Sequence, residues 1–161
     1  MRLSTLGVKL GYGIEQSAGT KPGTFTELGL VESIGGINLD VEQIDVSCLT
    51  DTITQYVKGR QDTGGTWDIS FIADPDNSIT PLETMFTSVA TAAAQGKSTW
   101  YEVLVPNMSK AFFIVADCGD TIPLPEIGQN EALIIPLSLI IKQYKGLDTK
   151  VDMSGGGGSS T

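Results

Sequence analysis

The stretch that most constrains the fold runs from Gly36 to Ala73 and contains two segments of alternating character. In residues 37–42 and again in residues 66–71, an apolar side chain occupies every second position. This period of two is typical of a strand with one buried face. Residues 47–65 between them are mostly polar and form a connection much longer than a tight hairpin needs. We therefore expect two long strands joined by a long loop, and we interpret the loop as a contact with a partner.

The first of these strands changes phase along its length. Its apolar residues stand at odd positions up to Val41 and at even positions from Ile44 onward. A bulge near Glu42 and Gln43 would return both sets to one face.

Four further segments are predicted to be strands. They are residues 25–33, 98–105, 110–118 and 132–144. The last is so apolar that we expect both of its faces to be covered. Pro136 lies within it and lacks a backbone N–H, so we expect a bulge or a break there.

One helix is predicted over residues 81–95. Thr80-Pro81-Leu82-Glu83 fits a capping box with proline at the first helical position. The residues that follow place an apolar stripe on one face, and Gly96 provides a stop. The opposite face carries no charge, as expected for a helix that becomes partly covered. The fold class is therefore mainly β, a β-sandwich or barrel with one flanking helix.

Composition suggests one domain with two extensions. Residues 1–24 are rich in glycine and poor in large apolar groups, so we expect an N-terminal arm. Residues 25–146 carry the β domain. Residues 147–161 become polar and then glycine-rich, which predicts a flexible C-terminal tail.

The charge and the residue types exclude several kinds of site. The chain has 10 Lys and Arg against 19 Asp and Glu, a net charge of −9 that opposes an ordinary grip on nucleic acid. It has no histidine, which removes His-based catalysis and most zinc sites. Asp74 to Ser78 could face calcium, but the glycine and the glutamate of an EF-hand loop are missing. We predict no enzyme activity, no metal and no cofactor.

Other features of the chain indicate its compartment. Cys48 and Cys118 lie far apart in sequence with no CxxC spacing, so we expect small buried residues without a disulfide, in a protein made in a reducing cytoplasm. No segment approaches the length of apolar sequence that spans a bilayer.

The order of the elements resembles the tail tube proteins, or major tail proteins, of long-tailed bacteriophages. The resemblance covers most of residues 25–145 and is carried by the glycine-rich arm, the two alternating strands with their long connection, Trp67-Asp68-Ile69-Ser70-Phe71 followed by Asp74, the capped helix and the final apolar strand. That family shares its tube fold with contractile injection systems and type VI secretion.

The resemblance implies a structural subunit of hexameric rings that stack into a hollow tube. Its partners would be copies of itself, together with tail terminator, tape measure and baseplate proteins. DNA would pass through the lumen without specific binding, and the location would be the virion tail, assembled in the cytoplasm of a bacterial host.

Two sets of residues are assigned roles on this basis. Acidic candidates for the lumen are Asp40, Glu42 and Asp68, although periodicity alone does not separate a channel lining from an ordinary solvated sheet face. The candidates for stacking between rings lie in the 47–65 loop and are Asp51, Gln55, Tyr56, Lys58, Arg60 and Asp62. The alternative function is a monomeric β-sandwich binding module, such as a virion decoration or adhesion domain, that uses this loop to hold a ligand.

Overall fold

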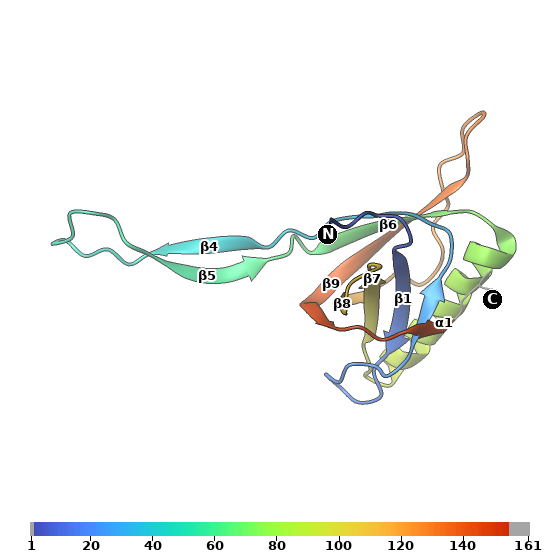
Figure 1. The fold of residues 1–161 in the computed structure, drawn as a ribbon, viewed down its shortest axis with the longest axis horizontal. Coiled ribbons are helices and arrows are strands. Elements are labelled where there is room, and N and C mark those ends of the chain that lie inside the picture. The colour runs from blue at the N-terminus through green and yellow to red at the C-terminus, as the bar shows by residue number, and fades with distance from the viewer. Residues whose placement is uncertain (1, 155–161) are drawn as a thin grey trace.

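The computed structural model describes residues 2–154 and has a curled β-sheet body with one helix and one long projecting hairpin (Figure 1). The elements follow in the order β1 (Lys9–Ile14), β2 (Phe25–Leu28), β3 (Val31–Ile34), β4 (Asp40–Asp45), β5 (Tyr56–Asp62), β6 (Thr66–Ile72), a π-helical turn (Pro75–Ile79), α1 (Thr80–Ala94), β7 (Thr99–Leu104), β8 (Lys110–Asp117), β9 (Ile134–Thr149) and β10 (Met153–Ser154). The mainly β fold with one flanking helix is confirmed.

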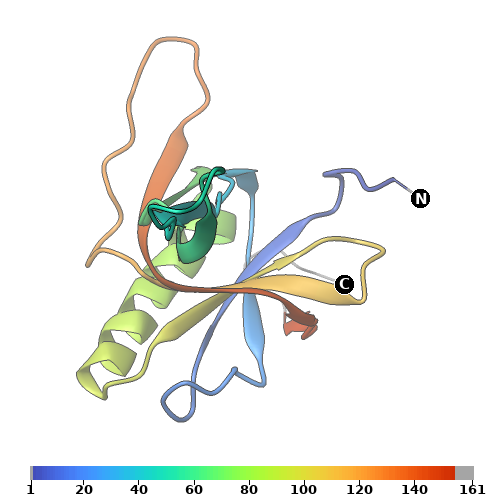
Figure 2. The same ribbon diagram turned by 90° about the vertical axis from the view of Figure 1, so that its left-hand side faces the viewer.

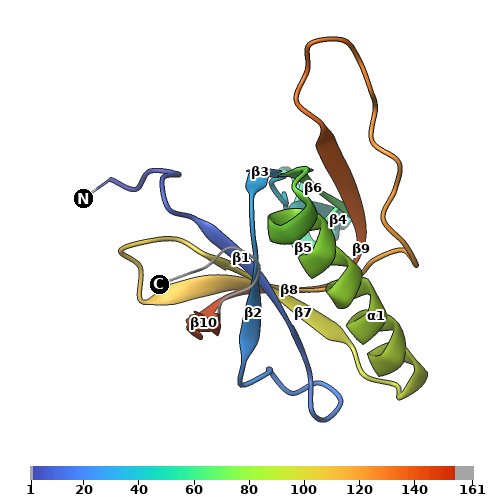
Figure 3. The ribbon, with the colours of Figure 1, turned by 90° about the vertical axis from the view of Figure 1, so that its right-hand side faces the viewer.

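The body is one eight-stranded sheet in the order β10-β2-β1-β7-β8-β9-β6-β3, and only β10 and β2 pair in parallel. β9 connects its two halves. The residues of β9 up to Ile140 pair with β6, and those from Ile140 onward pair with β8. The strand therefore changes neighbours along its length, and the sheet curls around it (Figures 2 and 3).

The main core lies inside this curl and is closed by α1. Trp67, Ile69 and Phe71 of β6 are buried, as their alternation predicts. They belong to one cluster with residues of β1, β7 and β8 and with the apolar face of the helix, namely Leu10, Tyr12, Tyr101, Ile114, Leu82, Met85, Phe86 and Val89.

The turn at Gly35 is fixed by its contact with β6. Trp67 Nε1 donates a hydrogen bond to the carbonyl oxygen of Gly35 at 2.7 Å, and the Gly35 N–H donates to the carbonyl oxygen of Asp68, also at 2.7 Å. A Cβ atom at Gly35 would lie 2.7 Å from that Asp68 oxygen, so glycine is required.

The helix lies where it is expected, but its start differs from the prediction. Asp74 caps the π-helical turn by accepting hydrogen bonds from the N–H groups of Asp76 and Asn77, which hold the pKa of its carboxyl below the usual value. Thr80 is already helical and its hydroxyl donates to Pro75 O, so the predicted capping box does not form. The stop at Gly96 is confirmed, with a φ of +74° just after the helix.

The N-terminal segment is not only an arm. Residues 9–14 form β1 between β2 and β7. Leu10 and Tyr12 supply its buried side chains, and small glycines alternate with them. The low apolar content of residues 1–24 concealed this strand. The predicted strand over residues 25–33 is also divided, since Leu30, with a φ of +56°, separates β2 from β3.

In β9 only one face of the apolar half is covered. Ile135, Leu137 and Leu139 are buried, whereas Pro136 and Ile140 are exposed. Pro136 pairs in register with Ser70, so the bulge or break expected there is absent. The expectation that both faces are covered is therefore wrong.

The chain after β9 packs against the outer face of the sheet. Val151 and Met153 contact a second cluster built on Phe25, Trp100 and Phe113. Residues 147–154 are therefore structured, contrary to the predicted tail, while residues 155–161 lie outside the described residues.

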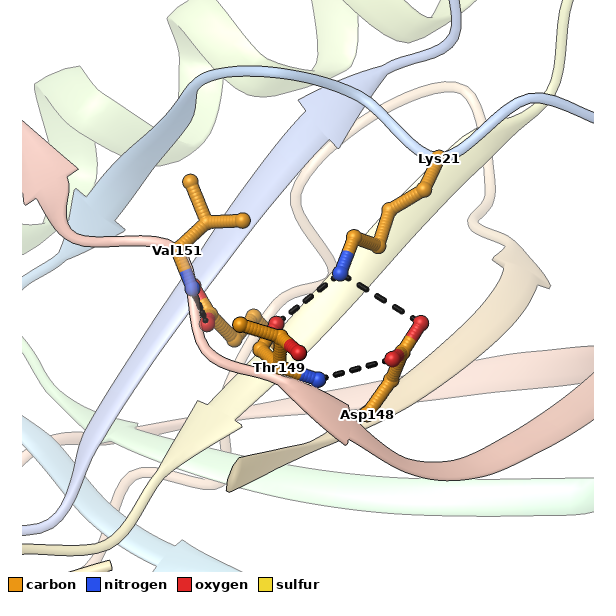
Figure 4. A network of polar contacts seen from close by, with 5 residues as sticks. Lys21, Asp148, Thr149 and Val151 are labelled. Atoms are coloured by element: carbon orange, nitrogen blue, oxygen red, sulfur yellow. Dashed lines mark hydrogen bonds and ion pairs between the residues drawn. The ribbon is translucent and has the colours of Figure 1, made fainter. Parts of the chain in front are cut away.

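Lys21 helps to hold this segment in place (Figure 4). Its Nζ donates to Thr149 O at 2.9 Å, pairs with Asp148 Oδ2 at 3.4 Å and lies 4.6 Å from the ring centroid of Phe113.

Glu102 is a buried carboxyl beneath this segment. One of its oxygens accepts a hydrogen bond from Val151 N at 2.8 Å, and the other has no hydrogen-bond partner among the described residues. Burial raises the pKa of Glu102. Because the folded state favours the neutral form, stability is highest below the ordinary glutamate pKa and is lost as the pH rises through the raised value.

Substituting Glu102→Gln should therefore flatten the pH dependence of stability. The variant should gain in Tm relative to the parent at pH 8 and not at pH 4, as measured by thermal unfolding across that range. The exposed Glu32→Gln is the matched control and should leave the slope unchanged. Parallel pH profiles for Glu102→Gln and the parent would contradict this account.

Candidate assembly interface

The 47–65 region is not one continuous loop, because it contains the tip and the second strand of a hairpin. Its residues 56–62 form β5, which pairs antiparallel with β4 in a separate two-stranded sheet. Figure 1 shows this hairpin extending far from the body, and along the chain it is inserted between β3 and β6. The connecting tip is residues 46–55.

Short-range hydrogen bonds shape the tip. Cys48 N donates to Asp51 Oδ2 at 2.8 Å, and Asp51 N donates to Cys48 O at 3.0 Å. Gln55 N donates to Ser47 Oγ at 2.6 Å, and Val46 N donates to Gln55 O at 3.0 Å. These contacts close the end of the hairpin without any contribution from the body.

The expected bulge is present, but the extra residue lies in β5. Val41 pairs with Gln61 and Gln43 pairs with Lys58, so a single residue of β4 faces two residues of β5. β4 itself is therefore regular, and by the period of two, Val41 and Ile44 point to opposite faces of the hairpin. The expectation of a single apolar face is replaced by apolar groups on both.

The hairpin leaves many large apolar side chains in solvent. Leu49 and Ile53 at the tip are 106% and 77% exposed, respectively. On the strands and directly beside them, other apolar residues that are exposed by at least 40% are Leu39, Val41, Ile44, Val46, Tyr56 and Val57. A two-stranded ribbon has no second layer packed on it to bury such groups, and it is marginally stable alone in water. A surface of this composition fits a contact with another protein.

The residues assigned to stacking all lie on this hairpin. Asp51 is in the tip, Gln55 directly precedes β5, and β5 carries the other four, Tyr56, Lys58, Arg60 and Asp62. The role in stacking that we assign to them stays a prediction.

The two cysteines differ in exposure. Cys48 lies at the tip and is exposed, so the expectation that both cysteines are buried is wrong for Cys48. Cys118 is half-buried, and both thiols are free.

The lumen candidates separate into two places. Asp40 and Glu42 lie on β4, and Asp40 pairs across the hairpin with Asp62. Asp68 lies on the outer face of β6, where its Oδ1 accepts a hydrogen bond from Ser138 Oγ of β9 at 2.7 Å. All three carboxylates face solvent.

A small apolar cavity marks the base of the hairpin. It has a volume of about 210 Å³, and its lining includes Gly36 and Ile37 from the chain that leads into β4, with Trp67 of β6 and Tyr144 of β9. The hairpin therefore meets the body at an open apolar site.

Sequence reasoning missed the apolar contribution of the hairpin. Leu49, Ile53 and Val57 sit among polar residues and were treated as part of a polar loop. The available signal was the pair of strand-forming residues Tyr56 and Val57, which favours a second strand that returns along β4.

The described residues contain neither a cluster of metal ligands nor a membrane-spanning helix. Across residues 2–154, no three His, Cys, Asp or Glu side chains gather as metal ligands would. Within the same range, no helix has the length and apolar character needed to cross a membrane.

No protein-family model matches the chain, and no curated protein matches it. Among solved structures, the chain is similar to one in the cryo-EM structure of the anti-feeding prophage baseplate, 6-fold symmetrised, with 12% identity and a TM-score of 0.45, covering 92% of this chain and 96% of that chain.

Proposed function

We propose that this protein is a non-enzymatic structural subunit that assembles with copies of itself into stacked hexameric rings, forming the hollow tube of a phage tail. The observation that carries the proposal is the β4–β5 hairpin, with apolar side chains exposed on both faces and at its tip. Such a hairpin gains stability only when a partner covers it.

A second copy is the partner that best fits the hairpin. The hairpin carries both signs of charge, since Lys58 and Arg60 lie in the same segment of the chain as Asp51 and Asp62. It also has two unpaired strand edges, which can pair with strands of neighbouring subunits. Mixed charge and open edges suit repeated contacts between identical chains, as in a ring stacked on a ring.

The proposed conduit agrees with the charge of the chain. The net charge of −9 and the solvent-facing carboxylates of Asp40, Glu42 and Asp68 would repel phosphates from the wall. DNA could then slide without binding. We assign the faces that carry Asp40, Glu42 and Asp68, on β4 and on the outer side of β6, to the lumen. We assign the 47–65 part of the hairpin to the joint between rings.

Negative-stain microscopy and size-exclusion chromatography of the purified protein test the proposal. We expect hollow tubes of uniform diameter built from stacked rings, with a particle size that grows with protein concentration. A strictly monomeric species at millimolar concentration would overturn the proposal and favour the binding-module alternative.

A further inference from the structure

Two bulges in β9 place the side chains of Lys142 and Lys145 on the same side of the sheet. Phe113 and Ile114 are consecutive in β8, but Lys145 is inserted between their partners Gly146 and Tyr144. In the same way, Lys142 is inserted between the partners of Val115 and Ala116. Residues three apart in a regular strand point to opposite faces, so both side chains share one groove because of the bulges.

The groove that these lysines line has an apolar floor. It has a volume of about 300 Å³ and lies between β7, β9 and the β1–β2 connection, with Trp100 and Val115 at its base. Lys145 Nζ lies 5.3 Å from the ring centroid of Trp100, and Lys142 Nζ donates to Ser98 Oγ at 2.8 Å. The groove thus combines apolar surface with two cations.

The buried carboxylate of Glu15 also lines this groove, and it is held mainly by N–H donors. Burial alone would raise the pKa of Glu15, but hydrogen bonds from Ser98 N, Trp100 Nε1 and Gly19 N, with a smaller contribution from the charge of Lys142, bring it below the usual value. Its charge is therefore balanced largely by N–H donors. The ion pairs among the described residues are Lys9–Glu27 and Lys21–Asp148. No carboxylate of these residues therefore lies within ion-pair distance of Lys142 or Lys145.

The connection between β8 and β9, residues 118–133, has the complementary character. From residue 111 to residue 141 the chain contains no Lys or Arg, and this connection carries Asp120, Glu126 and Glu131. Leu124 and Ile127 on either side of Glu126 are 84% and 73% exposed.

The same connection is preorganised for docking. Pro123 and Pro125 restrict its backbone to extended conformations, which lowers the entropy that is lost when it binds.

The connection and the groove lie at opposite ends of the body. In Figures 1, 2 and 3 the connection projects from the top, whereas the β1–β2 connection that borders the groove lies at the bottom. Figure 2 looks along the hairpin, so this separation runs across the hairpin direction. A chain cannot fill its own groove in this arrangement, but a neighbouring copy can.

We propose that residues 118–133 of one subunit dock in the groove of the next, with Glu126 facing Lys142 and Lys145 and with Leu124 and Ile127 on the apolar floor. This contact is head-to-tail, so it closes into a ring when the rotation per subunit permits. It rests on the proposed function in one respect, that the assembled particle is a ring; the docking itself can be measured without any tube.

Charge exchange between the two surfaces tests the contact. Glu126→Lys and Lys145→Glu, each made alone, should weaken self-association roughly tenfold or more, because each places like charges together. Both substitutions in one chain should restore association, and so should a mixture of the two single variants. Sedimentation velocity and native mass spectrometry give the stoichiometry. Glu32→Lys and Lys110→Glu, exposed and distant, are the controls with the same change of charge.

Each result separates this inference from the proposed function. Rings or tubes that form unaltered in both single variants would overturn the docking while leaving the tube intact. Loss of association in the single variants with rescue in the mixture would establish the docking even if no stacked tube is ever seen. Loss without rescue would overturn it.

Discussion

Replacing residues 40–62 with a short glycine-serine turn is expected to give a folded subunit that no longer forms stacked tubes. The body does not depend on this hairpin, because β3 and β6 pair with each other directly and hold the chain on both sides of it. The exposed apolar residues of the hairpin would be lost together with the contact that we propose for them. Circular dichroism and thermal unfolding report the fold, and electron microscopy reports the assembly.

A smaller change at the tip refines this experiment. The double substitution Leu49→Ser and Ile53→Ser removes the most exposed apolar groups of the hairpin and should shorten or abolish tubes. The polar pair Thr52→Ser and Thr54→Ser is the matched control and should assemble normally. If the shortened chain without residues 40–62 still forms tubes of normal length, the hairpin is not the joint between rings.

Substituting Trp67→Ala should cost about 3–5 kcal/mol of folding free energy, the range for a large aromatic side chain removed from a core. Trp67 is 1% exposed and packs edge-on against Tyr101 at a centroid distance of 6.1 Å. Its Nε1 also satisfies the Gly35 carbonyl that turns the chain toward the hairpin. Urea denaturation of the hairpin-deleted chain, at a protein concentration where sedimentation velocity finds it monomeric, measures this cost.

The control for this substitution lies on the same strand. Ile72 is 43% exposed and alternates away from the core, so Ile72→Ala should change the unfolding free energy by less than about 1 kcal/mol. Equal losses at the two positions would mean that β6 has no distinct inner and outer faces.

The sequence predicted best those elements whose period is carried by large side chains. β6, β7, β8 and α1 were placed within a few residues, since their buried residues recur at regular intervals. β1 was missed because its inward positions alternate with Gly11 and Gly13, which make the segment look too poor in apolar groups to be a strand.

The candidate interface was only half predictable. The polar stretch was recognised as unusual, but β5 escaped detection because it contains Gly59 and three charged residues at its centre and end, and its pairing with β4 is what makes it a strand. The groove was not predictable at all. Bulges at Lys142 and Lys145 depend on the register between β8 and β9, and a single strand read by itself does not contain that register.

The direct pairing of β3 with β6 makes the hairpin an insertion whose length is independent of the body. Closing a longer insertion costs little, because the entropic penalty grows only with the logarithm of its length. Each residue added to both strands would extend the reach by about 3.3 Å while leaving every contact of the sheet unchanged. The reach of the hairpin can therefore change in evolution through this one segment, with no need to redesign the core that supports it.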